Sequence, residues 1–253
     1  MNFDISHLLE QWDYLPGQVV VRRFTGKDGI EKIQLRVDLG LLQMNAQDRP
    51  DGKRPLGHPS LFDHYQARLQ KYRAEFDSEG RGFVLRAEDC SRLQLEALQY
   101  HHRYICLLQL EDHAGVIRDT ERNLAVFDFV QKFGESEELV WSMLQFKPQL
   151  LMVHTRAKAS EFLRAKDFSA AIEQIETGIA RIQAFYREHS RGDLLEQSGE
   201  LTYLRNWLNE IANQRPLSKR EALEKALNDA VNNEDYEKAA RMRDALRNLK
   251  PTE

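Results

Sequence analysis

Histidine is the residue type in this sequence best suited to metal binding and proton transfer. His101 and His102 are adjacent, so on a helix their side chains point about 100° apart and cannot hold one metal ion together. His58 and His64 are better spaced, but a proline and a serine between them are expected to begin a helix. Pairs of the type Glu-x-x-His, which di-iron bundles place on two helices, do not occur. We expect no metal site and no cofactor.

The two cysteines, Cys90 and Cys106, could act as nucleophiles. Both fall in one expected helix, where sixteen residues of rise separate them by about 24 Å, far beyond the reach of a disulfide. We therefore expect both thiols to be reduced. Apolar neighbours such as Ile105 and Leu107 favour a core position for Cys106. No Gly-rich phosphate loop, Gly-x-Ser-x-Gly elbow or Cys-x-x-Cys motif is present, so no motif identifies an enzyme.

Helices are expected to carry most of these residues. From Ser60 onward the apolar residues recur at a period of 3.6, and Leu61, Tyr65, Leu69 and Phe76 fall on one predicted face. We predict helices from Ser60 to near Gly80, from Ala87 to about Leu110, from Val116 to Phe133, and over 136–146, 148–165, 168–189 and 194–212. Residues 159–172 weakly resemble the turn of a tetratricopeptide unit. No copy lies one period of about 34 residues away, which favours an ordinary αα-hairpin.

The N-terminal residues 1–57 follow a different pattern. Ile5, Leu8, Leu9 and Trp12 predict one short amphipathic helix. A β-branched run followed by alternation at period two predicts a β-hairpin over 18–40, with a further short strand at 41–45. Residues 48–59 contain three prolines and two glycines and are expected to form a loop. Because loops often carry functional sites, this loop is a candidate site for an unrecognised enzyme; a plain connector is the alternative.

Composition and charge restrict the class of protein. The 253 residues carry 36 basic and 40 acidic side chains, and the net charge of −4 argues against the broad basic surface of a nucleic-acid-binding protein. No apolar run approaches the ~18 residues of a membrane span. The acidic N-terminus lacks the basic and apolar regions of a signal peptide. We expect a cytoplasmic protein without a membrane segment.

The most specific pattern lies at the C-terminus. Ser218 and Glu221 form a capping box after Pro216, which predicts a helix start. Apolar residues then recur at helical spacing up to Val231, Asn232-Asn233-Glu234 predicts a turn, and Asp235 can cap a second helix. The second helix presents one side made of Tyr236, Ala239, Ala240, Arg243 and Leu246. The pattern predicts a helical hairpin with equal numbers of basic and acidic residues.

This stretch resembles the UVR motif, the helical hairpin found in UvrB, in UvrC and in adaptors such as McsA that work with the protease chaperone ClpC. The matching features are Leu223 and Leu227, Ala230-Val231, the turn Glu234-Asp235-Tyr236-Glu237, and then Ala239-Ala240, Arg243-Asp244 and Leu246. The resemblance covers about 27 residues. The rest of the chain resembles neither UvrB nor UvrC and lacks the cysteine-rich segments of McsA. The resemblance implies a protein-docking module in which Tyr236, just after the acidic turn, belongs to the docking surface.

The sequence thus predicts a mainly α-helical adaptor with three parts: residues 1–57, a helical body over 58–213, and the hairpin over 217–250. The expected partner is a Clp-type chaperone, an excision-repair protein of the UvrB/UvrC kind, or a second copy of the chain. An accessory DNA-repair factor is the alternative. The candidate partner-binding residues are Leu227, Val231, Tyr236, Ala239, Ala240, Arg243 and Leu246. We further expect the stem of Arg243 to be buried and its head to pair with Glu234 or Asp229.

Overall fold

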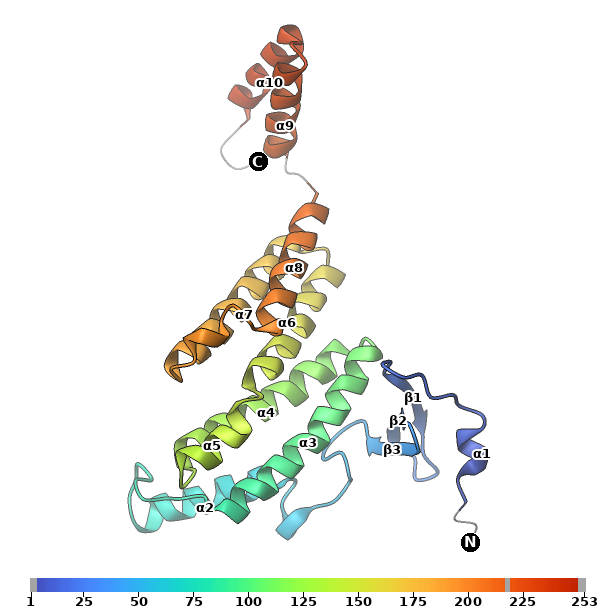
Figure 1. Cartoon of the computed structure of the whole chain (residues 1–253), viewed down its shortest axis with the longest axis vertical. Coiled ribbons are helices and arrows are strands. Elements are labelled where there is room, and N and C mark those ends of the chain that lie inside the picture. Colours follow the sequence, from blue (N-terminus) through green and yellow to red (C-terminus); the bar gives the residue numbers. More distant parts are fainter. Residues whose placement is uncertain (1–3, 217–218, 250–253) are drawn as a thin grey trace. The chain divides into compact units, whose positions relative to one another are not determined.

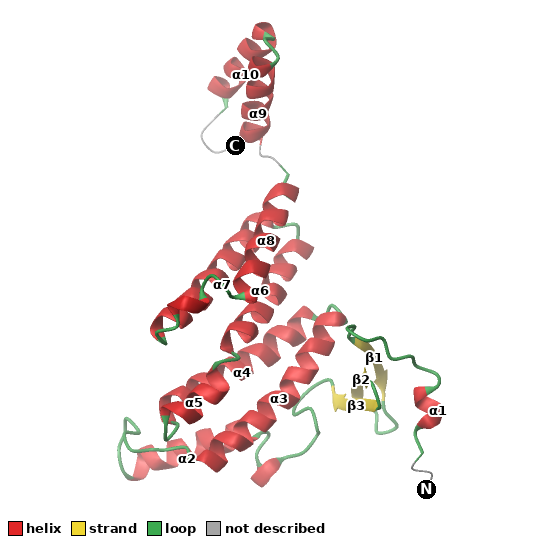
Figure 2. Cartoon of the chain, in the orientation of Figure 1, coloured by secondary structure: helices red, strands yellow, loops and turns green. Residues whose placement is uncertain are grey.

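The computed structural model describes residues 4–216 and 219–249. The chain separates into two compact units, the first ending at Leu208 and the second beginning at Asn209 (Figure 1). The first unit holds a small sheet and most of the helices, and the second holds a helical hairpin (Figure 2). The predicted fold class, mainly helical with an N-terminal β region and a C-terminal two-helix hairpin, is confirmed.

The N-terminal sheet has three antiparallel strands in the order β1-β2-β3, namely β1 (Val20–Thr25), β2 (Glu31–Val37) and β3 (Gly40–Asn45). The predicted hairpin and the further short strand are both confirmed. Gly29 has a φ of 75°, which glycine adopts without the steric cost of a Cβ, and it lies in the turn between β1 and β2. The preceding helix α1 (Ser6–Leu9) is shorter than predicted and ends before Trp12.

The two faces of the sheet differ in character. On one face the side chains of Arg22, Gln34 and Gln43 form a hydrogen-bonded row across the three strands, with bonds of 2.7 and 2.8 Å. The Arg22 guanidinium lies 4.3 Å from the Trp12 ring, and Arg36 donates to the Trp12 carbonyl at 2.8 Å. The segment after α1 therefore covers this polar face. Ile33 is fully buried on the other face.

Long helices make up the rest of the first unit. They are α2 (Leu61–Glu75), α3 (Ala87–Gln109), α4 (His113–Phe133), α5 (Glu137–Leu144), α6 (Lys147–Arg164), α7 (Phe168–Glu188) and α8 (Gly199–Gln214), the last of which continues into the second unit. Side chains of Ser60, Asp112, Ser136 and Asp167 accept hydrogen bonds from backbone N–H groups in the first turns of α2, α4, α5 and α7. These caps explain why the helices begin close to the predicted positions.

Two boundaries differ from the prediction. The helix predicted over 194–212 begins at Gly199, because residues 192–194 form a separate short 3-10 turn. Phe76, predicted on the buried face of its helix with Tyr65 and Leu69, is instead 72% exposed. It follows the end of α2, where its backbone has left the helical conformation (φ −125°), so the helical period no longer sets its direction.

Helices α6 and α7 form the αα-hairpin that the sequence predicted. Ala159 and Ala171 are fully buried, as expected for two helices in close approach. The closest point lies further along, where a Cβ built on Gly178 would come within 2.2 Å of the Thr155 hydroxyl. Glycine at 178 therefore sets the distance between the two helices. Arg156 on α6 lies 5.8 Å from the ring of Tyr203, which brings α8 against the same hairpin (Figure 1).

Cys90 and Cys106 are both buried free thiols on α3, as predicted. Burial raises the pKa of Cys90 to about 11 and that of Cys106 to about 12. Both side chains are therefore protonated at neutral pH and act as small apolar residues of the core. Among the residues that the structure describes, no helix combines the length and the apolar character needed to cross a membrane.

Candidate protein-binding site

The second unit contains the hairpin of α9 (Lys219–Asn232) and α10 (Tyr236–Asn248). The turn between them is closed by hydrogen bonds from the Glu234 N–H to the Val231 carbonyl at 3.0 Å and from the Asp235 N–H to the Ala230 carbonyl at 2.8 Å. The Asp235 side chain accepts from the Lys238 N–H at 3.0 Å, which confirms the predicted cap of the second helix. The capping box predicted at Ser218 lies outside the described residues.

Small residues lie between the two helices of the hairpin. Ala230 on α9 and Ala239 on α10 are the buried ones, and Leu227, Ala240 and Leu246 are half-buried. A core of alanines lets two helix backbones approach closely but buries little apolar area. The candidate residues Ala239, Ala240, Leu227 and Leu246 therefore belong wholly or partly to the packing of the hairpin itself.

Tyr236 and Val231, in contrast to the residues packed between the two helices, are exposed. Tyr236, the first residue of α10, is 70% exposed, and Val231, in the last turn of α9, is 50% exposed. The Tyr236 hydroxyl forms no hydrogen bond with any residue that the structure describes. An aromatic and a β-branched residue thus flank the turn, both with most of their apolar surface in water. Exposed apolar side chains grouped in this way are typical of sites that contact another molecule.

Arg243 differs from the expectation. Its side chain is 58% exposed, and the contacting carboxylate is that of its neighbour Asp244, with 3.6 Å between Nε and Oδ1. The predicted partners Glu234 and Asp229 are not used. The packing of the hairpin continues past Arg243 to the half-buried Leu246, but the Arg243 side chain itself is exposed and its guanidinium remains in water. An exposed ion pair of this kind contributes little to stability.

The charges of the hairpin are balanced. Residues 219–249 carry seven basic and seven acidic side chains, and Arg220 pairs with Glu224 at 2.9 Å along α9. Arg215 pairs with Glu221 at 2.5 Å, which ties the start of α9 to the segment before it. A surface without net charge gives no general attraction for a polyanion such as DNA.

The first unit contains a buried charged network that the sequence analysis missed. The side chains of Arg103 and Asp119 are each 1% exposed, and Arg103 donates to both carboxylate oxygens at 2.6 and 2.7 Å. Its Nη1 also donates to the carbonyls of Asn45, Gln47 and Asp48 at 3.0, 3.1 and 2.6 Å. Arg103 therefore joins the loop that follows β3 to α3 and α4.

Glu96 anchors the next part of the same loop. Its buried carboxylate accepts from the N–H groups of Leu61 and Phe62 at 2.8 and 3.2 Å, at the positive end of the α2 dipole. Arg49 lies 2.9 Å from one of its oxygens, and Arg122 donates to the other. Burial lowers the pKa of Arg122, and the charge of Glu96 opposes that shift. These contacts give the segment predicted as a 48–59 loop a structural role.

His101 and His102 form one pair of histidines in the first unit, and His58 and His64 form another. His101 lines a slot beside α6, whereas His102 lines a shallow cavity beside β3, in agreement with their predicted divergence. The rings of His58 and His64 meet edge to face with centroids 5.1 Å apart. Over residues 4–216 and 219–249 no group of three or more His, Cys, Asp or Glu side chains is placed to hold a metal ion.

Comparison with known proteins finds a match over the C-terminal hairpin and none over the rest of the chain. The family model described as the UvrB/uvrC motif matches residues 218–250, which include α9 and α10, and no family model matches the rest of the chain. Searches of curated proteins and of solved structures find no match. No comparison therefore matches the first unit, with its sheet, helices and buried network.

Proposed function

We propose that this protein is a non-catalytic adaptor that docks a protein partner through the turn end of its C-terminal UVR hairpin. The main support for this proposal is the position of Tyr236, which is 70% exposed at the turn between the two helices of the matched motif. The second support is that the hairpin falls in a compact unit separate from the first 208 residues. A short hairpin with an alanine core and an exposed aromatic residue is suited to recognition.

Tyr236 is suited to be the anchor of such an interface. A tyrosine offers a large apolar area with few rotatable bonds, and burying it in a partner costs little conformational entropy. Val231 can extend the same apolar contact across the turn. Arg243 is exposed on the same helix and can supply a polar contact at the rim. Anchor residues of this type commonly lose more than ~2 kcal/mol of binding energy when truncated.

The partner is proposed to be a Clp-type chaperone, an excision-repair protein of the UvrB/UvrC kind, or a second copy of the chain. The UVR motif supports a protein partner in general. Balanced charge on the hairpin counts against the alternative of direct DNA contact. The other alternative, an enzyme using the 48–59 loop, conflicts with the engagement of Arg49 and of the Asp48 carbonyl in the buried network. Both cysteines are free thiols, which suits a reducing cytoplasm.

The test compares two aromatic truncations. Tagged wild-type protein, Tyr236→Ala and Phe76→Ala are used to capture partners from a lysate of the source cells. Phe76 is the matched control because its exposed fraction, 72%, is close to the 70% of Tyr236, and it lies in the first unit. Each retained protein is identified by mass spectrometry, and its dissociation constant is then measured by calorimetry. Sedimentation measurements on the same variants detect self-association.

We expect Tyr236→Ala to weaken partner binding or self-association at least thirtyfold, which corresponds to about 2 kcal/mol. Phe76→Ala should change it less than twofold. Circular dichroism melting should place the body of both variants within a few degrees of the wild type. Normal binding by Tyr236→Ala together with a much lower melting temperature would make Tyr236 part of the internal packing, and the proposal would then be wrong.

A further inference from the structure

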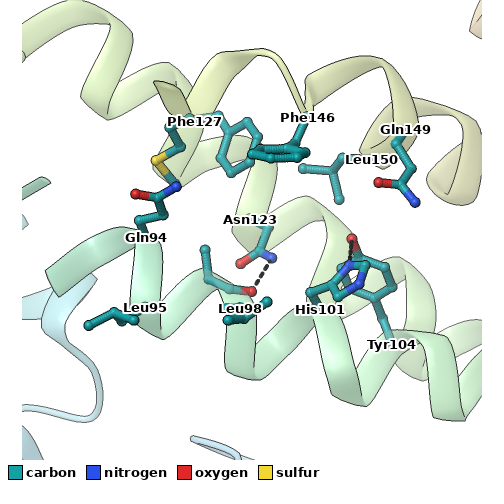
Figure 3. Close-up of a pocket in the computed structure, with 12 residues that line it drawn as sticks. Gln94, Leu95, Leu98, His101, Tyr104, Asn123, Phe127, Phe146, Gln149 and Leu150 are labelled. Atoms are coloured by element: carbon teal, nitrogen blue, oxygen red, sulfur yellow. Dashed lines mark hydrogen bonds between the residues drawn. The ribbon is translucent and has the colours of Figure 1, made fainter. Parts of the chain in front are cut away.

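An apolar slot is formed by residues of the first unit alone. It has a volume of about 400 Å³ and is formed by α3, α4, the end of α5, Phe146 and the first turn of α6. Figure 3 shows Leu95 and Leu98 along one side of the slot and Phe127, Phe146 and Leu150 along the other. Ligand pockets in proteins typically have volumes of ~300–1,000 Å³ and mostly apolar walls.

The rim of the slot is unusually apolar for exposed surface. Leu95 is 65% exposed, Phe146 is 51% exposed and Leu98 is 47% exposed. None of the twelve residues that line the slot is Asp, Glu, Lys or Arg, although 30% of the chain is charged. A site without a charged partner penalises an ionised ligand, because the desolvated charge would stay uncompensated. The lining therefore selects for an uncharged occupant.

One end of the slot carries a hydrogen-bond donor. The His101 Nδ1 lies 2.7 Å from the Tyr104 hydroxyl, and burial lowers the pKa of His101 and raises that of Tyr104 (Figure 3). We assign the phenol as the donor to Nδ1, because no other described residue accepts its proton, and this assignment leaves the proton of the neutral imidazole on Nε2. Gln149 lies at the same end of the slot. The imidazole N–H and the amide can both bind an uncharged oxygen.

We propose that this slot binds an uncharged, elongated apolar molecule that carries a hydroxyl or carbonyl oxygen at the His101 end, the chemistry of a medium-chain fatty alcohol or acyl ester. The volume corresponds to roughly thirteen non-hydrogen atoms at ~30 Å³ each. An α-helix is ~10 Å across and rises 5.4 Å per turn, so the slot holds about the volume of a single turn. A small apolar molecule can fill this space, whereas a helix of a partner protein can place no more than the side chains of about one turn in it.

The test is fluorescence titration of the full chain with 1-naphthylamine, an uncharged apolar dye small enough for the volume of the slot, at pH 8. Bound dye is then displaced with 1-decanol or with decanoate, which share an apolar chain and differ in head-group charge, each below its aggregation threshold. Leu98→Arg places a cation on the exposed rim, and Leu39→Arg is the control, because Leu39 is 89% exposed in the turn between β2 and β3. Circular dichroism checks that both variants are folded.

We expect wild-type protein and Leu39→Arg to bind the dye equally and to release it to 1-decanol at concentrations at least tenfold lower than to decanoate. Leu98→Arg should bind 1-decanol at least tenfold more weakly than the wild type does. Its preference for 1-decanol over decanoate should be reduced or reversed. Three results would overturn the proposal: absence of dye binding, equal competition by the two head groups, or unchanged binding in Leu98→Arg. Dye release by an amphipathic helical peptide but not by 1-decanol would also overturn it, in favour of a protein partner.

Discussion

Replacement of Arg103 by methionine tests the buried network that joins the N-terminal loop to the helical body. Arg103→Met keeps much of the apolar stem but leaves the Asp119 carboxylate, 1% exposed, without its bidentate partner. Breaking a buried ion pair by removing one partner costs roughly 3–5 kcal/mol. Arg118 still lies 2.9 Å from Asp119 and offsets part of that cost. The carbonyls of Asn45, Gln47 and Asp48 also lose a donor, at roughly 1 kcal/mol each.

The expected total is a loss of about 6 kcal/mol in the free energy of unfolding. For a unit of about 200 residues each kcal/mol lowers the melting temperature by roughly 2–4 °C, so we expect a decrease of about 12–24 °C. Calorimetry or circular dichroism melting measures it. The matched control is Arg92→Met, which removes an exposed pair with Glu88 and should lower the melting temperature by no more than about 2 °C.

A double variant separates charge pairing from the contacts with the loop. Arg103→Met combined with Asp119→Leu removes both charges, and an apolar pair can replace a buried ion pair at little cost. The three loop carbonyls still lack a donor in this variant, so we expect it to recover about half of the lost melting temperature. A single Arg103→Met variant that melts within 3 °C of the wild type would refute the assignment of Arg103 as the main tie between loop and body.

Three further predictions follow from buried groups and from the division of the chain. Burial lowers the pKa of His154 to about 4, so between pH 6.5 and 4 the unfolded state binds a proton that the folded state does not. The free energy of unfolding should therefore fall by up to about 3 kcal/mol as the pH drops through this range. His154→Gln should reduce this pH dependence, measured by urea unfolding, to the smaller slope that His101 and His102 contribute. Because the pKa values of Cys90 and Cys106 are raised to about 11 and about 12, native protein at pH 8 should not react with a thiol reagent within an hour, and both thiols should react after unfolding; fast native reaction of either would show that α3 opens. A fragment of residues 1–216 should melt within a few degrees of the full chain, and a large decrease or loss of solubility would show that the hairpin is part of the main core.

Much of the fold could be predicted because its signals are local. Capping residues such as Ser60 and Asp167 mark helix starts, and strict alternation marks strand β2. The hairpin turn was predictable for the same reason, since Asp235 caps a helix by contacts within three residues. Arg243 was misjudged because a helical wheel does not show how wide the packed face of α10 is, and Arg243 is exposed although it lies between the buried Ala239 and the half-buried Leu246.

The charged network was missed because its contacts join residues far apart in the sequence, from 16 positions for Arg103 and Asp119 to 55 or more for Arg103 and the carbonyls of the 45–48 segment. A local signal did exist. Glu96 and Arg103 occupy the same helical face as Leu93, Tyr100 and Leu107, where a charge can be tolerated only if it is paired in the interior. The slot lined by His101 could not be predicted, because it depends on the spacing of three helices that the sequence pattern leaves open.

The central claim is that Tyr236 contacts a protein partner, and site-specific photocrosslinking tests it most directly. A photoreactive phenylalanine analogue is placed at position 236 of the full chain, and in a separate protein at position 76, whose exposed fraction is similar. After irradiation in source cells, we predict a discrete adduct at position 236, with the mass of one partner protein or of a second copy of the chain, and none at position 76. Equal adducts at both positions, or none at position 236, would contradict the claim.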